Sequence, residues 1–177
     1  MRWMWIDRVV ELVPRERLVA VKHVSLAEEH LHDHFPAVAA DDGSILRPAM
    51  PVMPMSLIVE GMAQTGGILV GHAEDFREKV ILAKVSKATL EQDALPGCTL
   101  RYTAVIKSFS EMGASILGTI EMAEPEANGS PSFETIGSIE LIFSHLDRNM
   151  AGVAYPEHNF VFGEGFKTLL RTSGVLS

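Results

Sequence analysis

The chain of 177 residues is long enough for one compact domain, and its composition, 47% hydrophobic and 21% charged, excludes a disordered or disulfide-stapled polypeptide. Its formal net charge of −8 argues against nucleic acid as a partner, because nucleic acid would select a basic surface. The single cysteine, Cys98, cannot form a disulfide within the chain, which favours a reducing compartment.

The amino-terminal segment predicts a β-hairpin. Residues that favour strands alternate with polar residues from Trp3 to Leu12, residues 14–17 form the turn, and Leu18–Val24 form the second strand. Arg2 and Asp7 interrupt the segment, so it lacks the long apolar core of a signal peptide, and we expect a cytoplasmic protein.

Three histidines follow at alternating positions, His30, His32 and His34. In an extended chain their side chains would share one face, so a metal site is the first possibility to test. The metallohydrolase spacing His-x-His-x-Asp-His is absent, however, and zinc needs three or four ligands with supporting hydrogen bonds, so we predict no metal site. Phe35-Pro36 predicts an extended backbone that holds the His34 imidazole rigidly, as a structural or a functional histidine; His30 and His32 are interpreted as polar loop residues.

A loop from Ala37 to Met50 leads into an apolar helix. The turn signal Asp41-Asp42-Gly43-Ser44 lies inside the loop, and the prolines that follow favour an extended approach. Pro54 suits the first turn of a helix whose apolar periodicity continues to about Gly71. Three prolines at three-residue spacing also suit the ligand of a peptide-binding module, but such ligands lie in exposed segments and do not lead into an apolar helix.

Glu60 is the one carboxylate of this apolar helix. A buried, charged and unpaired carboxylate is costly, so Glu60 is paired, protonated or functional; the alternative is a solvated helix edge with Gln64 one turn away. Charged and polar residues interrupt the apolar window from Met50 to Val70, so we predict a buried helix and not a membrane span. A lone imidazole and a lone carboxyl group in apolar surroundings suit acid–base chemistry.

The second half of the chain predicts an antiparallel meander. Turn residues separate four β-like segments, and Cys98, which follows Pro96-Gly97 without a nearby base, is interpreted as a small buried or turn residue. The alternation is lost from Asp147 onward, so we expect a domain at 1–146 and an appendage at 147–177 in which Phe166–Arg171 is compatible with a short helix. The four segments are Val80–Thr89, Thr99–Phe109, Gly113–Glu121 and Phe133–Ser144.

Three motifs resemble the β-hydroxyacyl-acyl carrier protein dehydratases of fatty acid synthesis: His34-Phe35-Pro36, Pro51-Val52-Met53-Pro54 and Glu60-Gly61-Met62-Ala63-Gln64. Ile6–Leu12 and Leu95-Pro96-Gly97 are similar to further parts of that family, so the resemblance covers about residues 5–146. It implies the α+β hotdog fold, in which an antiparallel sheet wraps around a long central helix.

The resemblance also implies an activity, the dehydration of (3R)-hydroxyacyl thioesters on acyl carrier protein to trans-2-enoyl thioesters. The base would be His34 of one subunit and the acid Glu60 of another, with the backbone N–H of Met55 as the oxyanion donor. Gln64 would hold Glu60 or a water molecule, and Gly67 would let the substrate approach closely. No cofactor is implied beyond the phosphopantetheine that carries the substrate.

Two departures from the family pattern concern the loop and the helix start. Met55 replaces a usual glycine, and the 37–50 loop is longer than usual by about a dozen residues, so that it would form a lid or displace His34. The resemblance implies a homodimer or a trimer of dimers. Docking of an acidic acyl carrier protein would need a local basic patch, for which the candidates are Lys84, Lys87, Arg101 and Lys107.

Two alternatives to the dehydratase remain open. The same fold would serve a hydratase or a thioesterase, and a catalytically degenerate subunit that binds acyl chains would keep the fold without the activity.

Overall fold

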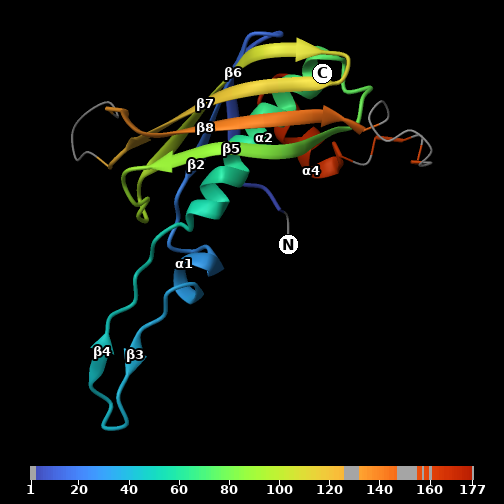
Figure 1. The fold of residues 1–177 in the computed structure, drawn as a ribbon. Helices are drawn as coiled ribbons and strands as arrows, with labels where there is room; N and C mark the ends of the chain where they lie inside the picture. Colours follow the sequence, from blue (N-terminus) through green and yellow to red (C-terminus); the bar gives the residue numbers. More distant parts are fainter. Residues whose placement is uncertain (1–2, 126–131, 147–154, 157, 160, 177) are drawn as a thin grey trace.

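The computed structural model describes residues 3–125, 132–146, 155–156, 158–159 and 161–176 (Figure 1). Six antiparallel strands form one sheet in the order β1-β2-β6-β7-β8-β5, and the sheet curves around a single long helix, α2 (Met55–Ala73). This arrangement confirms the predicted hairpin, central helix and meander. The strands are β1 (Arg8–Val13), β2 (Arg17–His23), β5 (Val80–Leu90), β6 (Thr99–Ser110), β7 (Gly113–Ala123) and β8 (Glu134–His145).

The central helix is held by close packing against the sheet. Ile58, Met62 and Ile68 are fully buried, and α2 contacts strands β2, β5, β6, β7 and β8. Glycine permits this approach at Gly61, where a Cβ atom would lie 2.7 Å from the Tyr102 ring. The helix therefore owes its stability to tertiary contacts, since each interior glycine costs roughly 1 kcal/mol relative to alanine.

Strand β5 lies at one edge of the sheet, where β8 is its neighbour. Its register with β8 shifts twice, between Leu82 and Lys84 and between Val85 and Lys87. All side chains from Leu82 to Lys87 are exposed, so none of the described segments covers the middle of the strand. The sheet therefore ends in an open edge that carries apolar residues.

The predicted backbone of His34 is wrong. Residues Glu29–Asp33 form a short helix, α1, and His34 closes it with helical dihedral angles, φ −71° and ψ −42°. The conformational restriction of a residue that precedes proline acts on Phe35, which directly precedes Pro36, and not on His34. In the helix, His30 and His34 lie one turn apart on one face, so His32 cannot share it, as it would in an extended chain.

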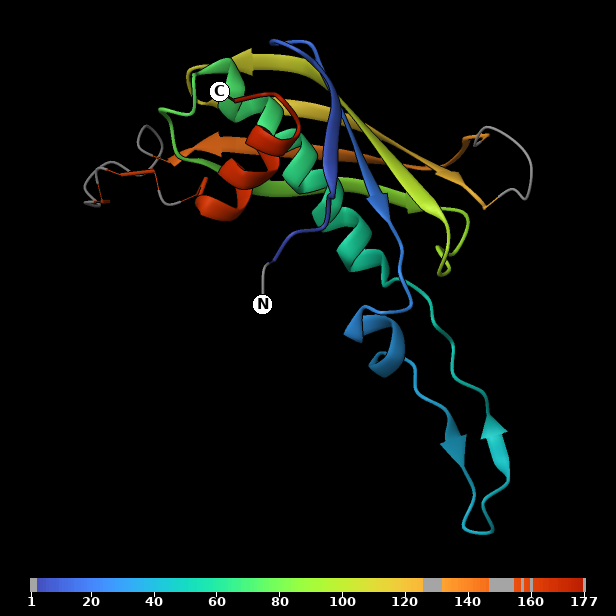
Figure 2. The same cartoon turned by 180° about the vertical axis from the view of Figure 1, so that it is seen from behind.

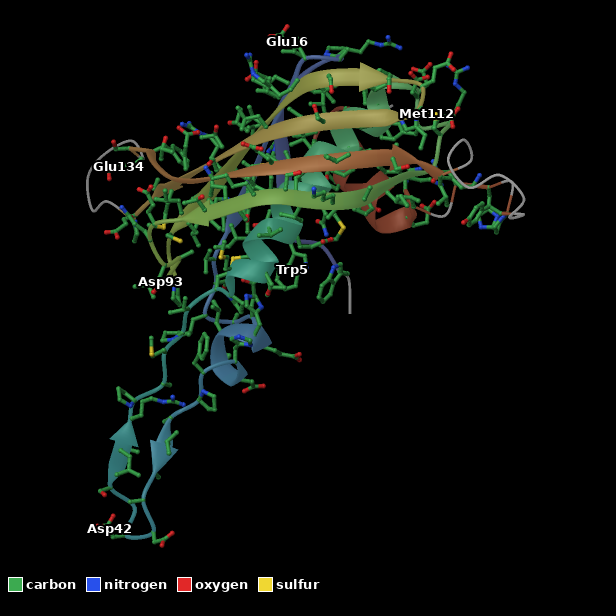
Figure 3. The ribbon with its side chains drawn as sticks, viewed as in Figure 1. Trp5, Glu16, Asp42, Asp93, Met112 and Glu134 are labelled. Carbon is green, nitrogen blue, oxygen red and sulfur yellow. The ribbon has the colours of Figure 1, made fainter. Side chains whose placement is uncertain are left out.

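The loop from Ala37 to Met50 forms an arm that projects from the body (Figures 1 and 3). Its two short strands, β3 (Val38–Ala39) and β4 (Ile45–Arg47), pair in an antiparallel hairpin. At the tip, the Asp42 carboxylate accepts hydrogen bonds from the backbone N–H and the hydroxyl of Ser44. The arm points away from its own protomer, so the expectation of a lid over that protomer is wrong.

The carboxyl-terminal helix α4 (Glu164–Thr172) packs against the body beside α2 and β1, as Figure 2 shows. Leu169 and Leu170 are buried, and the Ser173 hydroxyl accepts a hydrogen bond of 3.0 Å from the Val9 backbone. The short helix suggested for Phe166–Arg171 is confirmed, with longer bounds.

We predict that Gly61→Ala lowers the free energy of unfolding by about 1–3 kcal/mol, because the new methyl group would overlap the Tyr102 ring and the Trp5 carbonyl oxygen. Gly67→Ala is the matched control: its Cβ would meet only the Phe143 ring, at 3.5 Å, so it should leave stability unchanged or raise it by up to about 1 kcal/mol. Urea unfolding at one fixed protein concentration measures both. Equal stability of the two variants would contradict the packing argument.

Candidate active site

Glu60 is held by a hydrogen-bond network on α2. The Gln64 side-chain amide donates to a Glu60 carboxylate oxygen at 3.0 Å and to the Trp3 carbonyl oxygen at 3.1 Å. The amide oxygen of Gln64 accepts a bond of 2.9 Å from the Trp5 backbone N–H. Because a backbone N–H can only donate, Trp5 fixes which end of the buried amide faces Glu60.

Glu60 and Gln64 also line a cavity of about 270 Å³. Gly67 lies on the same helix face and lines it too, so the structure brings together three of the predicted site residues. Among the described residues that line the cavity, Glu60 and Gln64 alone have polar side chains. The cavity therefore has a polar edge on an otherwise apolar wall. Its apolar lining comes from Ala63, Ile68, Val80, Ile81, Leu82, Phe143, Val161, Phe162 and Phe166.

His34 lies at a different cavity, of about 650 Å³, which Leu57 and Trp5 also line. Its side chain is exposed and stands edge-on to the Phe35 ring, with centroids 4.4 Å apart. Within one protomer, His34 and Glu60 thus line separate cavities.

His30 also lines this second cavity, although the sequence pattern predicts a polar loop residue at this position. It stands edge-on to the Trp5 ring at 5.0 Å between centroids, and Figure 3 places Trp5 beside α2. Burial lowers the pKa of His30 below its ordinary value, so its neutral form is favoured. The four-residue spacing between His30 and His34 places both side chains on one face only if the segment is helical, so the sequence alone did not indicate that they lie together.

The Met55 backbone N–H belongs to the first turn of α2, where helix donors have no acceptor within the helix. Among the residues that the structure describes, no side chain caps this end of the helix. The amino terminus of α2 can therefore stabilise a negatively charged oxygen through free donors and the helix dipole.

The four predicted basic residues differ in availability. The Arg101 guanidinium makes two hydrogen bonds to the Glu121 carboxylate, at 2.8 and 2.6 Å, and lies over the Phe133 ring. The positive charge of Arg101 is therefore paired with Glu121 within the sheet. Lys84, Lys87 and Lys107 are exposed.

In the part of the chain that the structure describes, no group of three or more histidine, cysteine, aspartate or glutamate side chains is arranged to hold a metal ion. No helix in the same part is long and apolar enough to cross a membrane.

The helix wrapped by an antiparallel sheet, with a polar pair at an apolar cavity on that helix, defines a hotdog-fold protein. The dehydratase heterocomplex ApeI:P from Xenorhabdus doucetiae has a similar fold, with a TM-score of 0.56 at 16% identity over 81% of this chain and 83% of that one. A thioesterase family protein from Silicibacter pomeroyi has a TM-score of 0.56 at 10% identity over 77% and 82% of the two chains.

The chain belongs to the FabA-like domain family, whose model matches residues 2–123. It is 39% identical over 102 residues to a 3-hydroxyacyl-[acyl-carrier-protein] dehydratase FabZ of Geobacter metallireducens, a match that covers 56% of this chain and 60% of the relative. A second FabZ, from Clostridium kluyveri, is 30% identical over 126 residues, or 71% of this chain and 79% of the relative. The resemblance seen in the motifs is confirmed.

Cys98 is buried, as predicted, and burial raises the pKa of its thiol to about 11. Because only the thiolate is an effective nucleophile, we predict that native Cys98 reacts with iodoacetamide at pH 8 at least about tenfold more slowly than in the urea-unfolded chain. Raising the pH toward 11 should accelerate the native reaction more than the unfolded one. Equal rates for both states at pH 8 would contradict the burial argument.

Proposed function

We propose that the protein is a 3-hydroxyacyl-[acyl-carrier-protein] dehydratase that converts (3R)-hydroxyacyl thioesters into trans-2-enoyl thioesters with loss of water. The observation that carries the proposal is the Glu60–Gln64 pair at the edge of an apolar cavity on the central helix. A carboxyl group with one hydrogen-bonded oxygen beside an apolar wall suits a substrate with one hydroxyl group and a hydrocarbon tail. The family membership of the chain supports the same reaction.

Each proposed catalytic group has one role. His34 removes the proton from the carbon next to the thioester carbonyl, and Glu60 gives a proton to the departing hydroxyl group. The Met55 N–H donates to the thioester oxygen as its negative charge grows. Gln64 holds one Glu60 oxygen in place and leaves the other for the substrate. Because loss of water is redox-neutral, we propose that no cofactor takes part beyond the phosphopantetheine of the substrate.

We infer that the active site is formed between two subunits. His34 and Glu60 line separate cavities within a protomer, and we propose that a second copy brings them together. The open edge at β5 supports this inference, since Leu82 and Val85 are exposed there and a second β5 would cover them. The arm supports it as well, because it begins three residues after His34 and extends away from its own body.

We predict that His34→Ala and Glu60→Gln each lower kcat by about 10²–10⁴-fold, because each removes one proton-transfer group. When the two inactive variants are mixed under conditions that exchange subunits, half of the dimers pair unlike subunits, and one of their two sites regains both native residues. Activity should then return to about a quarter of the parent value. Mixtures that stay inactive while mass spectrometry detects mixed dimers would contradict the shared site.

The same assay separates the alternatives. Formation of the enoyl thioester from a (3R)-hydroxyacyl substrate is followed by its ultraviolet absorbance, and thioester hydrolysis by the release of free thiol. A thioesterase would release thiol without enoyl product. A degenerate acyl-binding subunit would show the same negligible turnover before and after His34→Ala.

We propose that the acyl carrier protein docks near Lys107 on β6, the predicted basic residue that is exposed and lies off the β5 edge that a second subunit would cover. Lys107→Glu should raise KM for the carrier-bound substrate by about three- to tenfold at low ionic strength, with kcat unchanged, because carrier proteins are acidic. The pantetheine-bound substrate should show no change. Lys167→Glu, with the same charge change in α4, is the control, and an equal rise in KM for that variant would contradict a local docking site.

A further inference from the structure

The carboxyl-terminal segment from Asn159 onward lies beyond the part of the chain that the family model matches, and it is fixed to the body. The Asn159 side-chain amide donates to the carbonyl oxygens of Phe76 and Glu78, at 2.9 and 3.0 Å. Its oxygen accepts a bond of 3.1 Å from the Val161 backbone. These bonds tie the start of the segment to the connection between α2 and β5.

Phe162 then packs directly on α2. Its side chain is buried and stands edge-on to Phe76, at 4.9 Å between centroids, and to Phe166, at 5.9 Å. A Cβ atom at Gly71 would overlap the Phe162 ring, so the glycine makes room for it. The ring therefore occupies a defined position near the carboxyl end of the helix.

This aromatic group also belongs to the cavity of Glu60. Val161, Phe162 and Phe166 line that cavity together with residues of α2, β5 and β8. Gly71, which contacts Phe162, lies eleven residues after Glu60, toward the carboxyl end of the helix. The carboxylate and the aromatic side chains thus line one apolar cavity, with Phe162 toward the carboxyl end of the helix.

We propose that Phe162 and Phe166 limit the space for the acyl chain in this cavity and restrict the protein to short acyl chains. The cavity volume of about 270 Å³ is consistent with a short chain, because it falls below the range of roughly 300–1,000 Å³ that is usual for ligand pockets. The inference rests on the proposed function for the identity of the ligand as an acyl thioester. It assigns chain-length selection to a segment outside the matched family domain.

The test compares four-carbon and ten-carbon 3-hydroxyacyl thioesters with the parent protein and two pairs of variants. Phe162→Ala and Phe166→Ala should raise the ratio of kcat/KM for the long over the short substrate by about tenfold or more, because each removal enlarges the cavity. Phe162→Trp and Phe166→Trp should lower that ratio. Leu169→Ala, at a buried position of α4 that does not line the cavity, is the control for general loosening of the segment and should leave the ratio unchanged.

A second measurement does not depend on turnover. Calorimetry measures the dissociation constants of saturated four-carbon and ten-carbon acyl-pantetheine thioesters, for which the alanine variants should shift selectivity toward the long chain. If the parent protein catalyses no dehydration but this shift occurs, the proposed function is wrong and the inference about the segment stands. If the parent is active and the alanine and tryptophan variants keep its selectivity, or Leu169→Ala shifts it equally, the inference is overturned.

Discussion

The packing of α2 into the curved sheet is the interaction on which the rest of the structure depends. Gly61 allows the helix to lie against the Tyr102 ring, and Gly118 on β7 leaves room for the Met62 side chain. These contacts fix both the distance and the rotation of the helix. Since Glu60 lies next to Gly61 in the chain, the same contacts determine that the carboxylate faces the cavity and not the sheet.

The amino-terminal segment takes part in the site through the Gln64 amide. This amide is buried, and it joins the backbone of Trp3 and Trp5 to the Glu60 carboxylate. Leaving a buried polar group unpaired is costly, so Gln64 and the chain before β1 hold each other in place. The hydrogen bonds of Gln64 to Trp3 and Trp5 thereby orient the Glu60 carboxylate, the group that we assign to proton transfer.

Local pattern was enough to predict much of the fold, but not the surroundings of the site. Alternating apolar residues predicted the long strands, and helical spacing after Pro54 predicted α2, because these periods follow from backbone geometry. The position of Phe162 against Gly71 joins residues ninety-one positions apart, which no local period encodes. The helical backbone of His34 was not predicted, because α1 is a short helix of five residues whose polar composition carries no strong periodic signal.

The arm should tolerate insertions and substitutions better than the body of the molecule. Every side chain from Asp41 to Met50 is exposed, so this stretch contributes almost nothing to the buried core. A two-stranded hairpin alone is at best marginally stable in water. Loss or lengthening of the hairpin should therefore change the stability of the folded body little. Its two ends nevertheless join the segments that carry His34 and Met55. Insertions at the distal turn should therefore be neutral for folding, whereas a change of even one residue at its base would displace both groups.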